Sequence, residues 1–238
     1  MRSLPPERKL EPGSALAVIP ARAGSTRLKN KNIYLLGGKP LIRWMTEAVI
    51  DSKCFDEVLI STDSDEIFNV VSDLPVSRHE RPPEYATTES TVLDSMVNLI
   101  ETHHKEYSFF SYFLPTCPFI SYDDIKDGFS LLKNDSSINS VVSMTKYGEP
   151  IQLACVMNEG RDVVPIFDNL TSGLTNSKFI KEYYRPSGAF YMSSWSGILK
   201  YKNFFKGHTR GIAIPRERSI DINTLSDIEL AEFMLKKN

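Results

Sequence analysis

Short apolar runs alternate along the chain with segments in which apolar residues recur at helical spacing. Residues 15–19 are apolar and stop at Pro20, and residues 58–60 and 109–114 form further apolar runs of strand length. Between the first two runs, apolar side chains recur at helical spacing over residues 41–49. This alternation is typical of a parallel sheet with helices on both faces, so the pattern predicts an α/β fold.

The rest of the chain continues this alternation with one interruption. Helices are expected at about residues 66–72, 92–100, 122–132 and 226–235, and strands at residues 140–144, 184–191 and 211–214. Between residues 146 and 183 the pattern degrades into turns and polar loops, and we expect an arm that mediates dimerisation there. Residues 1–14 are polar, contain three prolines and lack the apolar core of a signal peptide. They are expected to be a flexible extension of one domain at residues 15–238.

Composition and charge narrow the class of protein. A chain of 238 residues, 41% of them hydrophobic, is long enough to bury the core of one globular domain. The net charge of −2 gives no basic excess for nucleic acid, and no apolar run has the length of a membrane span. Cys54, Cys117 and Cys155 are far apart and form no C-x-x-C motif, which favours reduced thiols and a cytoplasmic protein.

A basic loop follows the first predicted strand. Residues 21–32 combine Gly, Ala and Ser with Arg22, Arg27, Lys29 and Lys31. In α/β folds such loops bind phosphate, because small residues let backbone N–H groups approach the anion while Arg and Lys neutralise it. The loop matches neither the P-loop nor the G-x-G-x-x-G motif. A solvated basic surface is an equally consistent interpretation of the composition.

Three further positions carry candidate chemistry, each beside a structural alternative. Asp63 follows a buried strand, where it either caps the next helix or takes part in catalysis. Arg81 either pairs with a neighbouring Glu or reaches a ligand. Alternation over residues 219–224 places Asp221 and Asn223 on one face, where they either bind a hard cation such as Mg²⁺ or form the cap of the last helix.

Seven motifs occur in an order that resembles the sugar-acid cytidylyltransferases, the CMP-sialic acid synthetases and their relatives acting on legionaminic and pseudaminic acids. Covering about residues 15 to 235, they are P-A-R-x-G-S with K-N and G-K-P-L-I, S-T-D, R-P-x-E-x-A, P-T-x-P, V-V-S, Y-R-P-x-G-A-x-Y and S-I-D-I-x-T. The resemblance implies a three-layer α/β/α nucleotidyltransferase fold with a mixed, mostly parallel sheet and a dimerisation arm. It also implies that CTP and Mg²⁺ are used to activate a nine-carbon α-keto sugar acid, with release of pyrophosphate, by a homodimer.

The same resemblance implies roles for individual residues. The nucleotide would be bound by Ala21, Arg22, Ser25, Arg27, Lys31, Asn32 and Arg81. The sugar acid would lie by Thr116, Arg185, Gly188 and Tyr191. Asp221 and Asn223 would hold Mg²⁺, and Arg22, Lys31 and Asp221 would carry the catalysis.

The chain departs from the family pattern at four positions. Thr26 stands where Lys usually follows Gly-Ser, Leu114 where Gln is common, Thr88 where Asp is common, and Asn223 at the second acid of the last motif. A site that loses a hydrogen-bonding side chain usually changes its substrate preference. These departures favour a legionaminic-type acid over N-acetylneuraminic acid.

Two alternatives follow from the same departures. Gly-Ser-Thr-Arg-Leu is similar to the loop of CMP-Kdo synthetases, although Lys31-Asn32 and the Y-R-P-x-G-A-x-Y motif argue against that activity. A non-catalytic nucleotide-binding protein on the same fold is the second alternative.

Overall fold

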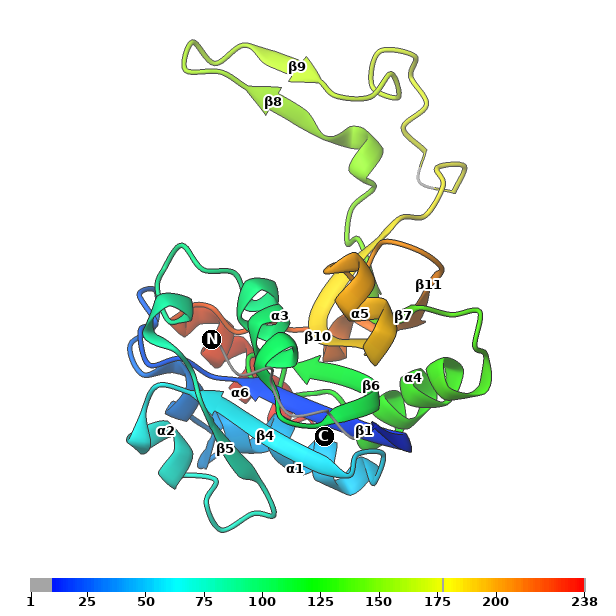
Figure 1. Cartoon of the computed structure of the whole chain (residues 1–238). Helices are drawn as coiled ribbons and strands as arrows, with labels where there is room; N and C mark the ends of the chain where they lie inside the picture. The colour runs from blue at the N-terminus through cyan, green and yellow to red at the C-terminus, as the bar shows by residue number, and fades with distance from the viewer. Residues whose placement is uncertain (1–9, 177, 238) are drawn as a thin grey trace.

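A mixed, mostly parallel sheet forms the middle of the protein, whose computed structural model describes residues 10–176 and 178–237 (Figure 1). Its seven strands are ordered β11-β7-β10-β6-β1-β4-β5. They are β1 (Leu10–Pro20), β4 (Glu57–Thr62), β5 (Ser77–Glu80), β6 (Glu106–Phe113), β7 (Ser140–Lys146), β10 (Tyr184–Ser194) and β11 (Thr209–Ala213). Only β10 runs antiparallel to its neighbours in this sheet, β6 and β7. The sheet expected from the sequence is therefore confirmed.

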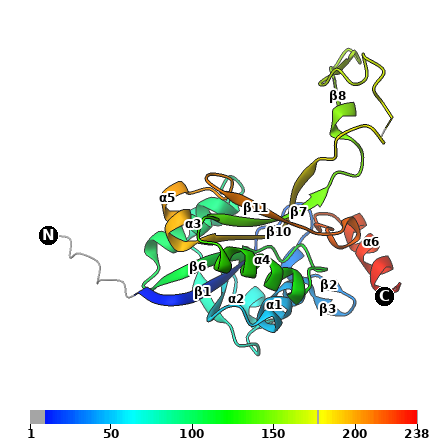
Figure 2. The same cartoon turned by 90° about the vertical axis from the view of Figure 1, so that its right-hand side faces the viewer.

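Helices cover both faces of the sheet (Figure 2). They are α1 (Leu41–Ser52), α2 (Asp65–Asn69), α3 (Val92–Thr102), α4 (Tyr122–Asn134), α5 (Trp195–Tyr201) and α6 (Leu225–Leu235). Buried residues of α1, α2 and α4 form one core with the sheet, and those of α3 and α5 form another on the opposite face. None of the helices in the described part of the chain has the length and hydropathy that a membrane crossing requires.

The central strand shows why the first apolar run is continuous. Leu16 and Val18 pack into the core under α3, while Ala17 and Ile19 pack into the core under α1, and all four are fully buried. A strand covered on both faces loses the alternation of apolar and polar residues, since both of its faces are removed from water. The burial of both faces of β1 thus reflects the three-layer packing of the domain.

Several helices begin at side-chain caps. Thr91 caps α3 and Ser121 caps α4, and each cap residue exchanges hydrogen bonds with an Asp three positions later. α2 begins at Ser64, whose hydroxyl accepts from the backbone N–H of Ile67. Its cap is therefore not Asp63, and the helix ends at Asn69, earlier than the pattern predicts.

Short elements complete the domain. They are the hairpin β2 (Leu35–Leu36) and β3 (Lys39–Pro40), and the 3₁₀ turns η1 (Lys31–Ile33), η2 (Pro83–Tyr85), η3 (Ile151–Leu153) and η4 (Arg216–Arg218). Residues 219–224 pair with no strand, although their alternation predicts one. Ile222 instead donates its backbone N–H to the carbonyl of Thr116 at 2.8 Å, which ties this segment to the turn after β6.

The expected N-terminal extension is partly wrong. β1 begins at Leu10, and Leu10 and Glu11 are in register with Glu106 and Tyr107 of β6. Beyond a bulge, the backbone N–H of Gly13 donates to Ser108 Oγ at 2.8 Å. Backbone pairing needs no apolar side chains, so the polar sequence concealed these five strand residues. Residues 1–9 lie outside the described residues.

A long arm leaves the domain between β7 and β10. It contains a two-stranded ribbon of β8 (Cys155–Met157) and β9 (Val163–Pro165), which projects away from the sheet in Figures 1 and 2. Its exposed large apolar side chains include Val156, Met157, Val163, Val164, Ile166, Phe167, Leu170, Leu174 and Phe179. The expected arm is present, and its role in dimerisation stays a prediction.

Candidate active site

The basic loop lies at the carboxyl end of the central strands. After β1, the backbone N–H of Ala21 donates to the carbonyl of Ser61, and that of Ala23 donates to Asp63 Oδ1 at 2.8 Å. Asp63 therefore fixes the start of the loop, a role that was not weighed from the sequence. Within the loop, Ser25 donates its N–H to the carbonyl of Ala23 at 2.8 Å.

Arg22 spans the site from the loop to the segment before α3. Its guanidinium donates to the backbone carbonyls of Ala86, at 3.3 Å, and Thr87. Its own carbonyl accepts from the side-chain amide of Asn32 at 2.9 Å, and Asn32 is buried. The Asn32 side chain thus joins the two ends of the loop by this hydrogen bond, while the cationic side chains lie at the surface of the loop.

Two cations of the loop meet the last motif of the chain. Arg27 Nη2 and Lys31 Nζ both donate to Asn223 Oδ1, at 2.7 and 3.1 Å. The amide nitrogen of Asn223 donates to Asp221 Oδ2 at 2.8 Å. The structure therefore brings together residues that are about 190 positions apart in the sequence, on one chain of hydrogen bonds.

Lys31 is the partly buried cation of this cluster whose pKa is shifted. Burial lowers the pKa of Lys31, and the charge of Arg27 acts in the same direction while Asp221 opposes both. A lysine held among other cations and partly removed from water is stabilised by an incoming anion, because the anion replaces the lost solvation.

The acidic side of the site fits a cation only in part. The carboxylate of Asp221 is a suitable oxygen ligand for Mg²⁺, which is often held by one or two carboxylates and by substrate phosphates. The side-chain oxygen of Asn223 accepts from Arg27 and Lys31, and its side-chain N–H donates to Asp221. Asn223 therefore differs from the expected metal ligand, because its oxygen is bonded to two cations. Among the described residues there is no group of three or more acidic, His or Cys side chains that would hold a metal alone.

Arg81 is buried at the end of β5 with unused hydrogen-bonding capacity. It is only 6% exposed, and within the described chain no group accepts from its Nη2. Burial lowers the pKa of Arg81 to about 10, Asp63 opposes this shift, and Arg22 adds to it. A buried donor without an acceptor is costly, and a ligand acceptor would remove the cost. No pairing of Arg81 with a neighbouring Glu is present in the described structure, so the first of its two sequence interpretations is not supported.

The residues expected at the sugar acid lie along the ends of β6 and β10. Thr116 is buried beside Cys117, and Gly188 has a φ of 89°, a conformation that favours glycine. A Cβ on Gly188 would lie 3.7 Å from Cys117 Sγ. Tyr191 stacks on Tyr112 at 4.8 Å between ring centroids, and burial raises the pKa of Tyr191.

Arg185 connects this side to the acidic segment. It lines a pocket of about 560 Å³ together with Asp221 and Asn223. Its guanidinium donates to the carbonyl of Pro186 at 3.2 Å and remains exposed. The side chain is thus available to a ligand in the pocket.

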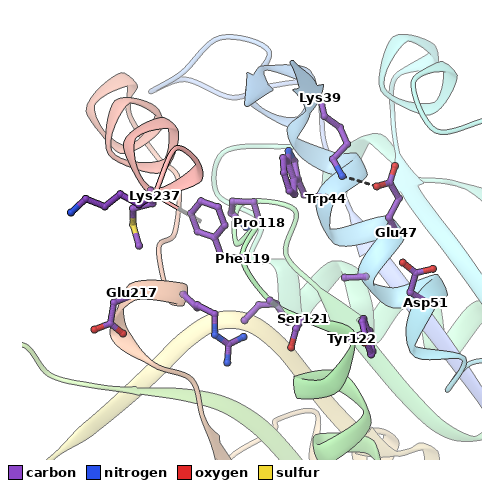
Figure 3. Close-up of a pocket in the computed structure, with 14 residues that line it drawn as sticks. Lys39, Trp44, Glu47, Asp51, Pro118, Phe119, Ser121, Tyr122, Glu217 and Lys237 are labelled. Carbon is purple, nitrogen blue, oxygen red and sulfur yellow. Dashed lines mark hydrogen bonds and ion pairs between the residues drawn. The ribbon is translucent and has the colours of Figure 1, made fainter. Parts of the chain in front are cut away.

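A separate groove of about 600 Å³ lies between α1, the turn after β6 and α6 (Figure 3). Trp44 and Phe119 contribute aromatic surface, and Lys39 pairs with Glu47 at 2.6 Å at the rim. Of the described residues that line it, none belongs to the expected site. The groove shares only Glu217 and Met234 with the pocket beside Asp221.

Clustered cations, an adjacent carboxylate and a three-layer α/β/α fold together define an enzyme that handles phosphate groups at the carboxyl edge of its sheet. Residues 16–160 match the family model described as Cytidylyltransferase. The chain belongs to this family and is a nucleotidyltransferase.

Curated relatives cover almost the whole chain. The CMP-N,N'-diacetyllegionaminic acid synthase of Legionella pneumophila is 32% identical over 233 residues, which are 94% of this chain and 97% of the relative. The pseudaminic acid cytidylyltransferase of Campylobacter jejuni is 29% identical over 228 residues, with the same shares covered. The N-acylneuraminate cytidylyltransferase of Escherichia coli is 30% identical over 224 residues, which are 94% of this chain and 52% of that protein. The homologues are thus sugar-acid cytidylyltransferases.

A solved structure supports the fold. A CMP:2-keto-3-deoxy-manno-octonic acid synthetase, determined in complex with CTP, superposes with a TM-score of 0.69. It is 17% identical and the match covers 94% of this chain and 100% of that one. The likeness confirms the nucleotidyltransferase architecture expected from the sequence.

Proposed function

We propose that this enzyme transfers the cytidylyl group of CTP to a nine-carbon α-keto sugar acid and releases pyrophosphate. The three curated relatives described above are named for sugar acids of this class, and two of them match over nearly their full length. The sugar acid is of the legionaminic, pseudaminic or sialic type, with a legionaminic-type acid favoured by Leu114 and Asn223.

The observation that carries the proposal is the meeting of Arg27 and Lys31 on a neutral acceptor, Asn223, next to Asp221. A hydrogen bond from a cation to a charged oxygen is roughly twice as strong as one between neutral groups. Triphosphate oxygens would therefore displace the amide of Asn223 from both cations. Arg22 and Ser25 extend the same anion site along the loop.

The reaction forms one bond and breaks another at the α-phosphorus of CTP. The anomeric hydroxyl oxygen of the sugar acid attacks, the bond to pyrophosphate breaks, and the hydroxyl proton passes to solvent water. Transfer of this kind depends on alignment and charge neutralisation, which Arg22, Arg27 and Lys31 supply. Asp221, with the nucleotide phosphates, would hold Mg²⁺, which supplies charge neutralisation at the phosphate oxygens when bound.

Separate sets of residues are expected to bind the two substrates. We assign Ala21, Asn32 and the unused Nη2 donor of Arg81 to the nucleotide. Thr116, Gly188 and Tyr191 form the wall expected for the sugar acid, and the exposed guanidinium of Arg185 would pair with its carboxylate. These roles rest on the site geometry together with the family.

We also propose that the enzyme is a homodimer held by the arm and that it works in the cytoplasm. The exposed Val156 and Val164 lie opposite each other on the ribbon, and an apolar surface of this kind usually marks an interface. Cys54, Cys117 and Cys155 are all free thiols, which agrees with a reducing compartment.

The direct test is release of pyrophosphate from CTP and Mg²⁺ with N-acetylneuraminic, legionaminic, pseudaminic and Kdo acids, each offered separately. We expect release with a nine-carbon acid and none with UTP or ATP. Asp221→Asn serves as the inactive control, and Asp127→Asn, an exposed carboxyl on α4, as the matched active control.

Each alternative has a distinct outcome in this test. Release with Kdo alone would establish the CMP-Kdo synthetase activity and exclude the nine-carbon substrate. Binding of CTP without release for any of the four acids would support the non-catalytic alternative.

A further inference from the structure

His79 lies next to the buried Arg81 in a way that the proposed function does not use. Ser61 and His79 are register partners on β4 and β5. Since side chains two residues apart in a strand share a face, Ser61, His79 and Arg81 all point to the side of the sheet that α3 covers, as Leu59 does. The three side chains therefore form a row that ends at Arg81, the residue assigned to the nucleotide.

The hydroxyl of Ser61 connects the other two side chains. His79 Nδ1 lies 3.1 Å from Ser61 Oγ, and Arg81 Nε donates to the same oxygen at 3.4 Å. Ser61 is fully buried. When His79 is neutral with a bare Nδ1, the Ser61 hydroxyl donates to Nδ1 and accepts from Arg81 Nε, so these three atoms all have a partner.

Protonation of His79 would break this arrangement. With hydrogen on Nδ1, Ser61 Oγ has to accept from His79 and from Arg81 at once, and its own hydrogen loses its acceptor in the described structure. A second positive charge would also stand beside a guanidinium that is already poorly solvated.

The neighbours of His79 favour the neutral form. Burial lowers the pKa of His79 below 6.5, and Arg81 and His103 act in the same direction while Glu80 opposes them. The switch to the charged form is therefore expected on the acid side of pH 6.5.

We propose that His79 is a positioning residue, which acts through Ser61 to hold the guanidinium of Arg81 where its unused Nη2 donor meets the nucleotide. The inference rests on the proposed function, because CTP is taken as the ligand. Arg81 itself touches the nucleotide, whereas His79 affects binding only through the orientation of Arg81.

The test measures CTP affinity by isothermal titration calorimetry in the presence of Mg²⁺ and without sugar acid. His79→Phe removes the acceptor of the Ser61 hydroxyl. His79→Asn keeps a hydrogen-bond acceptor at this position but has no titratable group. Phosphates of CTP titrate in the same pH range, so the quantity compared at each pH is the ratio of variant to wild-type Kd.

At about pH 8 we expect Kd to rise about fivefold in His79→Phe, as for loss of one neutral hydrogen bond, and to stay near wild type in His79→Asn. At about pH 5.5 wild-type binding should weaken relative to His79→Asn, because only the wild type gains the buried charge. With sugar acid present, His79→Phe should raise KM for CTP and leave kcat nearly unchanged.

Two further variants separate positioning from a general structural effect. Ser61→Ala should weaken binding like His79→Phe, and the double variant should be no weaker than either single one. His208 lies 3.3 Å from Ser137 Oγ through its Nδ1, so His208→Asn is a matched control at an exposed place away from the site. It should bind CTP as the wild type does at both pH values.

The outcomes are distinguishable from failure of the proposed function. Wild-type protein that does not bind CTP would overturn that function and this inference with it. Wild-type binding with ratios for His79→Phe and His79→Asn that stay at one over the whole pH range would overturn the positioning role alone. The positioning role would also be overturned if the Ser61→Ala and His79→Phe effects on CTP affinity added up in the double variant.

Discussion

The basic loop and the arm are both irregular segments, yet they differ in how their side chains are satisfied. In the loop, the buried Asn32 donates its side-chain amide to the carbonyl of Arg22 at 2.9 Å, and the exposed Asp63 accepts from the backbone N–H of Ala23 at 2.8 Å. In the arm, Asn158 makes comparable bonds to Asp162 at 2.9 Å, but both residues are exposed. The loop is thus preorganised by the domain for a ligand, whereas the arm presents apolar side chains such as Val164 that a second surface would bury.

The largest expected effect in this comparison is at Asp221. Asp221→Asn should abolish turnover, because it removes the charge of the carboxylate that the side-chain amide of Asn223 joins to Arg27 and Lys31. The fold and the oligomeric state should not change. Pyrophosphate release and thermal unfolding measure the two properties, and near wild-type rates at saturating Mg²⁺ would remove Asp221 from the metal site.

Arg22→Ala should lower kcat/KM by an amount that corresponds to about 3–4 kcal/mol of transition-state stabilisation. This is the expected loss for one preorganised electrostatic contact to the transition state. Steady-state kinetics with CTP and the active sugar acid measure this. Arg210→Ala, at an exposed position on β11, is the matched control and should keep wild-type kinetics. An unchanged kcat/KM in Arg22→Ala would remove this residue from the phosphate site.

Val164→Asp should act on the arm and its assembly. Fully burying one valine is worth about 1.5–3 kcal/mol, and a two-fold interface contains it twice, so the dimer dissociation constant should rise at least about a hundredfold. Analytical ultracentrifugation measures the constant. Ser172→Asp adds the same charge at an exposed polar position of the arm and should leave the dimer intact. A wild-type protein that is monomeric at all concentrations would refute the role of the arm.

The smallest expected effects are on stability, and they allow a direct comparison of Asn32 in the loop with Asn158 in the arm. Asn32→Ala should lower the free energy of unfolding by about 1–3 kcal/mol, because the carbonyl of Arg22 loses its buried partner. Asn158→Ala should change it by less than about 0.5 kcal/mol, since water replaces the exposed bonds. Urea denaturation gives both values, and equal losses would contradict the difference between the two regions.

Much of the fold was predictable because its signals are local. The apolar runs at residues 15–19 and 58–60 fall within β1 and β4, and the helices α1 and α3 fall where helical spacing predicts them. The first five residues of β1 were missed, since they join the sheet through backbone pairing with β6. The segment at residues 219–224 alternates like a strand but finds no strand partner, a condition that only the surrounding structure sets.

The site divides in the same way. Three features can be read from the residues alone: the alternating strands and helices, the basic loop after β1, and the order of motifs that indicates the cytidylyltransferase family. The anchoring of the loop by Asp63 and the bonds from Arg27 and Lys31 to Asn223 appear only once the chain is folded. Such contacts depend on which strand ends lie side by side, and hydrogen bonds over such distances along the chain leave no periodic trace in the sequence.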